Sequence, residues 1–305
     1  MVRILDEKMA KNIWDDNILK LSNPTYYQSY DYSRTYMEDE EINFLYDNDG
    51  DKKIYAFAKL KKGFVKIPFG PIVSSNATVE DIMRFIIEVS QIYQQDVMFS
   101  ISDDQIEEFN NKFGDIQKDW YFVTPLIDTT LSMEEILHNC NANRRRIIKK
   151  GLINIPRENI KYGVEYIDEF YKLYNKRMNE TGGRVDFSLD YLEHNLSEKN
   201  SDLVVCLDKD KVIAGHVIYH FGNTLITRYN CFDSLYSKIS PSARIDYELI
   251  NYACSNKDID YYDMSGLATG EEITEKTSNI NRYKQSYGPT KVLRYQWYRY
   301  RKLEV

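Results

Sequence analysis

The sequence predicts a two-domain α/β protein with mixed sheets, because one order of secondary-structure elements occurs in it twice. A hairpin of two strands, a third strand, a helix and a short strand follow one another in each half, about 160 residues apart. A chain of 305 residues is long for one domain and sufficient for two.

In the first half, the hairpin is indicated by two alternating apolar runs that flank Asn48-Asp49-Gly50, residues that favour a tight turn. Thr78 and Asp81 have the spacing of an N-terminal cap, and apolar residues at helical spacing follow them. The expected strands and helix of this half are residues 42–46, 54–60, 64–67, 79–93 (the helix) and 97–101.

The second half repeats this order around a turn at residues 208–211. Its expected elements are residues 203–207, 212–219, 225–231, 241–255 (the helix) and 260–264. This is the core order of the acyltransferase fold called GNAT, so we expect two GNAT-like domains side by side. The alternation at residues 291–300 predicts a last strand that returns to complete the first domain.

A basic helix is expected between the two halves, over residues 132–151. Ser132 and Glu135 form a capping box, and Gly151 is a suitable terminating residue. Five of the seven residues from 144 to 150 are basic. Two interpretations stay open: cations that favour a helix C-terminus, or an anion site in which arginine forks hold phosphate oxygens.

Composition excludes several classes of protein. With 43% hydrophobic residues the chain can bury large cores, and no run of about 20 apolar residues predicts a transmembrane helix. The N-terminal residues lack the apolar core of a signal peptide, so we expect a cytoplasmic protein. A net charge of −7 argues against nonspecific coating of nucleic acid, although a local basic site can still bind one phosphate-bearing ligand.

No metal site is expected from the cysteines and histidines. The four cysteines are far apart, and the four histidines complete no metal-ligand spacing with them. His216 and His220 share one face of an expected strand, and we interpret them as two hydrogen-bonded, partly buried histidines.

Four short motifs, taken in order, resemble the Fem-type (FemABX) aminoacyltransferases. They are Gly-Pro-Ile-Val at 70–73, Asn-Arg-Arg-Arg-Ile-Ile-Lys-Lys-Gly at 143–151, Tyr-Asp-Met-Ser-Gly at 262–266 and Arg-Tyr-Lys-Gln-Ser-Tyr-Gly at 282–288. Residues 27–29 and 170–183 are also similar to that family. The resemblance covers most of the chain and depends on order and spacing together.

The resemblance implies two GNAT-like domains and an enzyme that moves an amino acid from aminoacyl-tRNA to an amine of a peptidoglycan precursor. It also implies a UDP-linked or lipid-linked muropeptide as partner, with a lipid-linked substrate at the inner face of the membrane, and neither metal nor bound cofactor. The family's aromatic-Lys-x-x-aromatic-Gly motif matches Tyr283, Lys284, Tyr287 and Gly288. Its lysine is thought to stabilise the oxyanion that forms as the ester is attacked, and Lys284 is the catalytic candidate.

Five further residues are candidates for substrate binding. Tyr283 flanks it, and Tyr229 on an expected strand is a candidate wall of the substrate cleft. Arg145, Arg146 and Lys149 are candidate contacts for a nucleotide or tRNA phosphate. We expect the first domain at 1–150, completed by 291–305, and the second, with the active site, at 151–290. A general base is not evident, because serines follow the Gly-Pro turn where some family members have an acidic residue.

Two other functions stay open. The first is an acyl-CoA-dependent N-acyltransferase acting on a polysaccharide or sugar-nucleotide precursor. Such enzymes cradle the CoA pyrophosphate in a Gly-rich turn, and the corresponding residues 234–243 and 74–78 contain no glycine. The second is a non-catalytic module that binds a carbohydrate or muropeptide through its many tyrosines, which include residues 26, 27, 30, 32 and 36.

Overall fold

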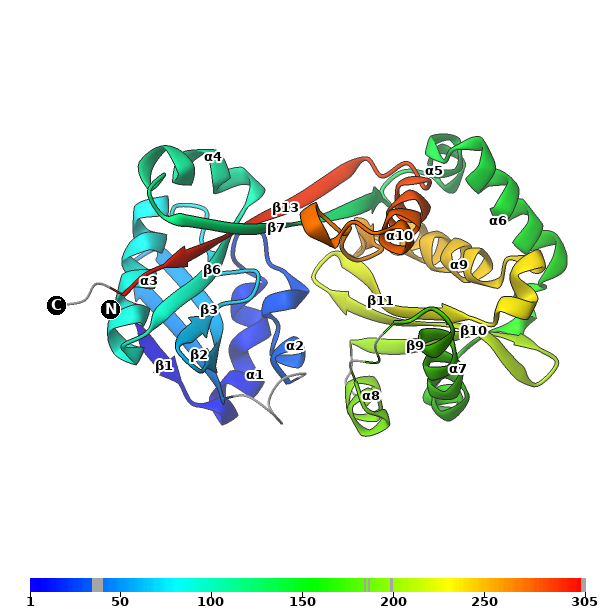
Figure 1. Ribbon diagram of the computed structural model, residues 1–305, viewed down its shortest axis with the longest axis horizontal. Coiled ribbons are helices and arrows are strands. Elements are labelled where there is room, and N and C mark those ends of the chain that lie inside the picture. Colours follow the sequence, from blue (N-terminus) through cyan, green and yellow to red (C-terminus); the bar gives the residue numbers. More distant parts are fainter. Residues whose placement is uncertain (35–40, 184, 186, 198–199, 303–305) are drawn as a thin grey trace. The chain divides into compact units, whose positions relative to one another are not determined.

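The computed structural model describes residues 1–34, 41–183, 185, 187–197 and 200–302, which form two compact units (Figure 1). The first unit contains Met1–Val123 together with Leu293–Val305, and the second contains Thr124–Val292. The expected boundary at residue 150 falls inside a helix of the second unit, because that helix packs against another helix of the same unit.

The first unit is a mixed sheet with helices against it. Its strands follow the order β1-β2-β3-β4-β6-β13, in which β4 and β6 are parallel and the other pairs are antiparallel. The elements are β1 (Arg3–Leu5), α1 (Glu7–Ile18), η1 (Tyr26–Gln28), α2 (Tyr30–Arg34), β2 (Glu41–Asp49), β3 (Lys52–Lys61), β4 (Phe64–Lys66), β5 (Ile72–Val73), α3 (Val79–Tyr93), β6 (Asp96–Ser102), α4 (Asp103–Lys112), the first part of β7 (Gln117–Asp128) and most of β13 (Lys291–Tyr300).

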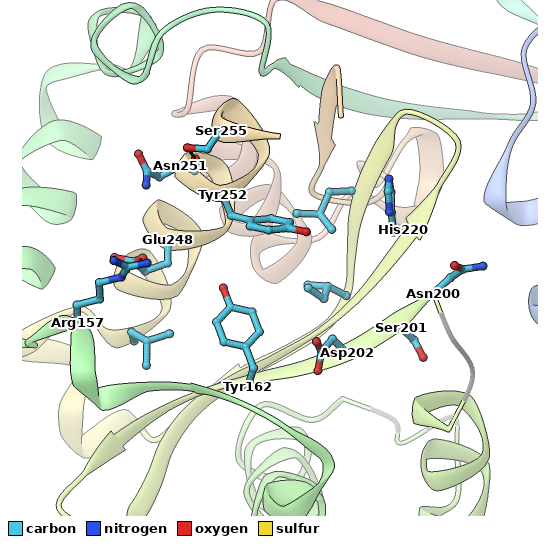
Figure 2. A pocket seen from close by; sticks show the side chains of 13 residues that line it. Arg157, Tyr162, Asn200, Ser201, Asp202, His220, Glu248, Asn251, Tyr252 and Ser255 are labelled. Carbon is cyan, nitrogen blue, oxygen red and sulfur yellow. Dashed lines mark hydrogen bonds and ion pairs between the residues drawn. The ribbon is translucent and has the colours of Figure 1, made fainter. Parts of the chain in front are cut away.

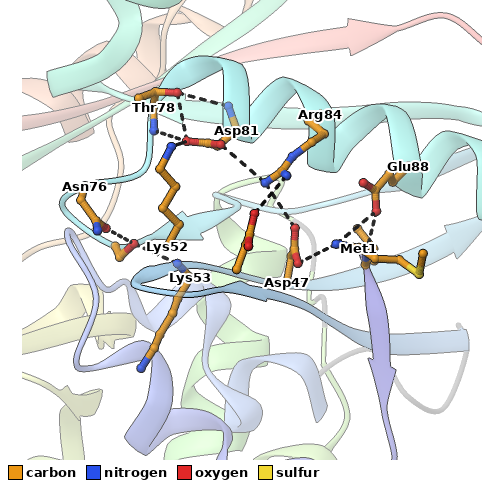
Figure 3. Close-up of polar contacts among 12 residues, drawn as sticks. Met1, Asp47, Lys52, Lys53, Asn76, Thr78, Asp81, Arg84 and Glu88 are labelled. Atoms are coloured by element: carbon orange, nitrogen blue, oxygen red, sulfur yellow. Dashed lines mark hydrogen bonds and ion pairs between the residues drawn. The ribbon is translucent and has the colours of Figure 1, made fainter.

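Side-chain contacts fix the N-terminal end of α3 (Figure 3). Thr78 and Asp81 form the expected capping box, in which each side chain accepts a hydrogen bond from the other residue's backbone N–H. Lys52 of the β2–β3 hairpin reaches Asp81 at 2.7 Å, and Arg84 lies 3.4 Å from the buried Asp47. These contacts join the helix to the hairpin beneath it.

The second unit is a mixed sheet between two layers of helices. Its strands follow the order β7-β12-β11-β10-β9-β8, in which only the described pair β11–β12 is parallel. The elements after β7 are α5 (Met133–Asn139), α6 (Ala142–Asn154), η2 (Arg157–Asn159), β8 (Ile160–Tyr162), η3 (Val164–Tyr166), α7 (Ile167–Glu180), α8 (Leu189–Leu196), β9 (Ser201–Asp208), β10 (Lys211–Phe221), β11 (Thr224–Phe232), η4 (Ser234–Ile239), α9 (Pro241–Ser255), β12 (Tyr261–Asp263), η5 (Gly270–Glu272) and α10 (Glu275–Gln285).

Helices α7 and α9 cover opposite faces of β10 (Figure 1). Gly215 faces α7 so closely that a Cβ there would lie 2.4 Å from the ring of Phe170. The next residue, His216, faces α9 and contacts Ser242, because neighbouring residues of a strand point to opposite faces. This alternation places a histidine in the layer between α9 and the sheet.

The basic segment differs from the single helix that the sequence predicted. The capping box of Ser132 and Glu135 is present, but the helix it starts ends at Asn139, and a second helix begins after Asn141. The side chain of Asn141 accepts a hydrogen bond from the backbone N–H of Arg144 at 2.8 Å and so caps the second helix. Gly151 does not terminate that helix.

Gly151 instead permits two helices to approach closely. A Cβ at this position would lie 3.2 Å from both the Cβ of Arg244 and the carbonyl oxygen of Ser240, at the start of α9. The absence of a side chain therefore brings the basic helix α6 against the N-terminal end of α9.

The predicted last strand is confirmed as β13 (Lys291–Tyr300), which pairs antiparallel with β6. None of the described helices combines the length and the apolar composition that crossing a membrane requires.

Candidate active site

Lys284 lines a cavity of about 740 Å³ in the second unit. The walls come from α7, β11 and α10, with contributions from the start of α9 and from the residues after β12. Among the lining residues are four basic side chains and one acidic side chain: Arg177, Arg228, Lys276, Lys284 and Glu275. This excess of positive charge, in a chain of net charge −7, favours a substrate with a phosphate or carboxylate group.

The ammonium group of Lys284 is held in place by backbone carbonyl groups. Its Nζ donates hydrogen bonds to the carbonyl oxygens of Ser265 at 3.1 Å and Gly266 at 2.6 Å. An ammonium has three N–H donors, so one remains for a ligand in the cavity. The residue lies in the last turn of α10 rather than in a loop.

Burial lowers the pKa of Lys284 to about 8, against the opposing influence of the Asp263 carboxylate. Asp263 is buried, and it accepts hydrogen bonds from the hydroxyl of Thr124 and the backbone N–H of Ser265. Lys284 is therefore still mainly a cation near neutral pH, but a cation that water stabilises poorly. Such a group gains most from a negative charge that develops beside it.

The end of α10 is anchored on one buried carboxylate. The hydroxyls of Tyr283 and Tyr287 both donate to Oδ2 of Asp246, the latter at 2.6 Å, and the Tyr262 hydroxyl reaches Oδ1 at 3.2 Å. The guanidinium of Arg144 lies 4.2 Å and 4.5 Å from the ring centroids of Tyr283 and Tyr287. Burial and the nearby carboxylate raise the pKa of both of these tyrosines, so both stay protonated and keep donating.

Gly288 completes this anchor. Its φ of +65° is in the left-handed region, and a Cβ there would lie 2.1 Å from the carbonyl oxygen of Asn139. The backbone N–H of Asn141 donates to the carbonyl of Ser286 at 3.0 Å. The break between α5 and α6 is thus the surface against which the end of α10 is seated.

A second, smaller cavity of about 370 Å³ is strongly basic. Arg144, Arg146 and Lys150 of α6 line it, together with Pro241 and Ser242 at the N-terminal end of α9. It shares Phe232, Ser242 and Tyr283 with the Lys284 cavity, so the two cavities adjoin. A helix N-terminus and three cations together suit a phosphate group.

The other candidates from the sequence lie as follows. Arg146 lines the basic cavity, whereas Arg145 donates from Nη1 to the carbonyls of His138 and Cys140 and so caps the end of α5. Lys149 is exposed and lines neither of these two cavities.

Tyr229 is also not among the described residues that line the Lys284 cavity. Its ring packs against Phe187 at 4.3 Å and Tyr174 at 6.2 Å between centroids, and its hydroxyl accepts a hydrogen bond from Arg228. Tyr283, which precedes Lys284 in the sequence, does line the Lys284 cavity.

Three polar residues of this site were not singled out as functional from the sequence: His216, Ser242 and Asp246. His216 was interpreted as hydrogen-bonded and structural, but its Nδ1 is buried without a hydrogen-bond partner among the described residues. Asp246 occupies a position on the buried face of α9, and a carboxylate one turn before Leu249 and Ile250 in the expected helix 241–255 is the signal that could have drawn attention to it.

A third cavity, of about 680 Å³, lies elsewhere between α9 and the strands (Figure 2). Tyr162 and Tyr252 face it from β8 and α9, and Asp202 and Glu248 add carboxylates to its lining. It contains neither Lys284 nor the basic residues of α6. The described residues include no cluster of histidine, cysteine and carboxylate side chains that would hold a metal ion.

Comparison with known proteins agrees with this architecture. Residues 138–285 match the family model described as an acetyltransferase (GNAT) domain. The crystal structure of FemX superposes with a TM-score of 0.74 over 97% of this chain and 96% of FemX, at 10% sequence identity. The chain has the Fem-type, GNAT-like fold.

Two further solved structures have a fold similar to that of this chain. The C-terminal domain of a putative lysylphosphatidylglycerol synthetase from Agrobacterium fabrum has a TM-score of 0.63 at 12% identity, with 95% of this chain and 91% of that one covered. A tandem GNAT protein from the clavulanic acid biosynthesis pathway has a TM-score of 0.53 at 9% identity, with 100% and 99% covered. No curated protein matches the chain by sequence. These comparisons support an acyltransferase of the GNAT kind.

Proposed function

We propose that the chain is an aminoacyltransferase that moves an amino acid from aminoacyl-tRNA to an amine of a peptidoglycan precursor. The peptide bond forms as the amine attacks the ester carbonyl, and the terminal ribose hydroxyl of the tRNA leaves. The donor is consumed as a co-substrate, so the proposed reaction needs no resident cofactor. The acceptor is a UDP-linked or lipid-linked muropeptide.

The observation that carries this proposal is Lys284 in its cavity. Attack on an ester produces a tetrahedral oxyanion, and a fixed cation stabilises it more than it stabilises the neutral ester. Lys284 is fixed by two carbonyls, is poorly hydrated and retains one N–H for the oxyanion. This arrangement supports acyl transfer to an amine as the reaction.

The size and charge of the two adjoining cavities support a nucleotide ester as donor. A volume of about 740 Å³ accommodates an aminoacyl ester beside an acceptor amine, but only the end of a tRNA. The basic cavity of Arg144, Arg146 and Lys150 then lies where a neighbouring phosphate can bind. The likeness to FemX and to a protein named as a lysylphosphatidylglycerol synthetase supports an aminoacyl group as the group transferred.

A second candidate function is transfer of an acyl group from acyl-CoA to an amine of a polysaccharide or sugar-nucleotide precursor. The match to a family model described as an acetyltransferase (GNAT) domain favours it, as does the basic cavity at the N-terminal end of α9. Against it, residues 234–243, which lead into α9, contain no glycine, whereas a CoA pyrophosphate is cradled by a Gly-rich turn at a helix N-terminus.

Parallel transfer assays distinguish the two functions. Purified protein is incubated with a UDP-linked muropeptide and either a pool of radiolabelled charged tRNAs or labelled acetyl-CoA, and label in the muropeptide is counted. We expect label from charged tRNA, abolished by ribonuclease and strongly reduced in the Lys284→Ala variant. Label from acetyl-CoA alone establishes the second function. Label from neither donor, also when a lipid-linked muropeptide is the acceptor, contradicts the proposal.

A further inference from the structure

Three side chains between β10 and α9 form a chain of polar contacts that ends in the Lys284 cavity. The Nε2 of His216 lies 3.0 Å from the hydroxyl oxygen of Ser242. The Nδ1 of the same ring lies 3.5 Å from Oδ1 of Asp246. Ser242 and Asp246 are one turn apart on α9 and face the same strand, so one helix presents both partners to the imidazole.

Only one of these three groups is accessible from the cavity. His216 and Asp246 are each 1% exposed, whereas Ser242 is half-buried and lines both the Lys284 cavity and the basic cavity. Among the described residues, the hydroxyl of Ser242 therefore both lines the cavity and contacts Nε2 of His216, so a substrate can exchange a proton with that nitrogen through it.

The surroundings of His216 determine where its proton lies. The Nδ1 faces a carboxylate oxygen and has no hydrogen-bond partner among the described residues, so a lone pair there would be repelled. The proton belongs on Nδ1, which leaves the lone pair of Nε2 to accept a hydrogen bond from Ser242.

Burial lowers the pKa of His216, and the nearby Asp246 opposes this effect, so the imidazole is neutral near pH 7. Among the described residues, further charged or titratable groups contact that carboxylate or line the two adjoining cavities. They include Tyr262 of β12, Tyr283 and Lys284 of α10, Tyr287 just after it, and Arg144 of α6, which stacks on two of the tyrosine rings.

We infer that Ser242 and His216 form the general base of this site, as a two-step proton relay, with Asp246 as the residue that positions the imidazole. The inference rests on the proposed function, transfer of an acyl group to an amine. It supplies the base that neither the sequence nor the Lys284 motif provides.

The relay moves protons as follows. As the amine nitrogen forms its bond to the ester carbonyl carbon, it gives one proton to the Ser242 oxygen. The Ser242 hydroxyl gives its own proton to Nε2 of His216 in the same step. When the C–O bond of the ester breaks, the imidazolium returns a proton through Ser242 to the leaving ribose oxygen, or to the leaving sulfur if the donor is a thioester. Protons and electron pairs balance, and no further reactant is needed.

A nucleophilic serine would use similar contacts, but two observations favour the relay. Asp246 already accepts hydrogen bonds from three tyrosine hydroxyls, and its distance of 3.5 Å from Nδ1 exceeds a normal hydrogen bond. Asp246 therefore stabilises a positive charge on the imidazole only weakly, and its main effect is to orient the ring. A nucleophilic serine would need a stronger partner for its histidine, because the imidazolium would persist until the acyl group left the serine. The amine is itself a nucleophile, so a covalent acyl-serine is not required.

The first test needs no substrate. Long-range ¹H–¹⁵N NMR spectra of protein labelled with ¹⁵N-histidine report the tautomer of each of the four histidines, and the His216→Gln variant identifies the signal of His216. We expect a neutral ring with its proton on Nδ1 at pH 7. A proton on Nε2, or an imidazolium at this pH, overturns the relay whatever the enzyme transfers.

The second test is kinetic and uses the donor and acceptor for which the parent protein shows transfer. We expect Ser242→Ala to lower kcat by about a hundredfold, because general-base catalysis contributes at least about that much, while KM is unchanged. Ser242→Thr, which keeps a hydroxyl, should retain most of the activity. Ser278→Ala is the control, because Ser278 is half-buried on α10 and lines neither the Lys284 cavity nor the basic cavity.

The pH profile separates a catalytic role from a structural one. In the parent, kcat/KM should fall on acidification through a pKa below that of an ordinary histidine, and this limb should be absent from His216→Gln. An unchanged kcat in Ser242→Ala contradicts the relay, and so does an acyl group on Ser242 detected by mass spectrometry of quenched protein. If the parent transfers nothing, the proposed function fails. The NMR measurement of the His216 tautomer then still tests whether Nε2 is free to accept a proton from Ser242.

Discussion

Replacing Lys284 by methionine removes one positive charge from the cavity and keeps an unbranched side chain. The variant loses the N–H group that faces the cavity, and the carbonyls of Ser265 and Gly266 lose their donor. A single positioned donor at a developing oxyanion is worth about 10²–10³-fold in rate. We expect kcat to fall by about this factor and KM to change little, because the interaction is made mainly in the transition state.

The alkaline side of the pH profile gives a sharper prediction. Because the pKa of Lys284 is about 8, the ammonium form outnumbers the amine by about ten to one near pH 7. Near pH 9 the ratio is reversed, so the fraction of enzyme with the required cation falls by about tenfold between the two pH values. Raising the pH therefore reduces the part of the rate that depends on Lys284. In Lys284→Arg the cation persists at every accessible pH, and the alkaline decrease should be absent.

The assay is the initial rate of label transfer at saturating donor, from mildly acidic to alkaline pH, for the parent and both variants. Urea denaturation of each protein serves as the folding control. A methionine variant that transfers at the parental rate would refute the role of Lys284. An alkaline decrease of the same size in Lys284→Arg would assign that limb to another group, such as the amine of the acceptor or product release.

Three further predictions concern residues that anchor the end of α10 or line the basic cavity. Gly288→Ala should reduce the free energy of unfolding by about 3 kcal/mol, since it adds left-handed strain to a clash with a backbone carbonyl; urea denaturation measures it. Tyr287→Phe should cost about 1.5–3 kcal/mol in the same measurement, because it removes a hydrogen bond to a buried carboxylate. The double variant Arg146→Ala/Lys150→Ala should raise KM for a phosphate-bearing donor severalfold, with a difference that shrinks as salt is added; steady-state kinetics at several ionic strengths checks this.

Each of these predictions has a matched control. Gly50→Ala has a similar φ of +60° but open space around the new Cβ, and should cost about 1 kcal/mol. Tyr247→Phe removes a hydroxyl that makes no hydrogen bond within the described part of the chain, and should be nearly neutral. Lys257→Ala removes an exposed charge from a turn beyond the C-terminal end of α9 and should leave KM unchanged. Equal effects in a variant and its control would contradict the corresponding argument.

The parts of the fold that depend on neighbouring residues could be predicted from the sequence. The capping boxes at Thr78 and Ser132 each involve residues three positions apart, and both are present. The strand at residues 291–300 was visible as alternation of side chains, and it is β13. The pattern of neighbouring residues was insufficient at the basic segment, where it is compatible both with one long helix and with two shorter helices. The apolar residues on either side of Asn141 fit one long helix, and only the contact of this break with the end of α10 favours two.

The candidate site could be predicted only in part, for a related reason. Lys284 was found because its motif is contiguous in the sequence. Ser242 and Asp246 are separated from Lys284 by about 40 residues and from His216 by about 30, and the fold alone brings them together. Asp246 is tolerated in the core because hydroxyls from three distant positions satisfy it, and no short window of sequence contains both the carboxylate and its partners.

The anchored end of α10 explains why so short a motif is informative. Tyr283 lies in the last turn of α10 and Tyr287 in the turn that follows it, and both hydroxyls reach the same carboxylate. Lys284 follows Tyr283 in the helix, so its side chain is rotated by about 100° onto the neighbouring face. The glycine is required by a backbone turn that no other residue accommodates without strain.

The positions of the motif therefore meet three requirements. The two tyrosines donate hydrogen bonds to Asp246, the lysine supplies a charge, and the glycine adopts a left-handed backbone angle. The spacing of the motif spans the last turn of α10 and the turn that follows it. An insertion of one residue between the two tyrosines would withdraw one ring from the carboxylate and turn the glycine away from its contact. Such a protein would keep all four residues of the motif and still lose the site. The number of residues between the motif positions therefore matters as much as their identity.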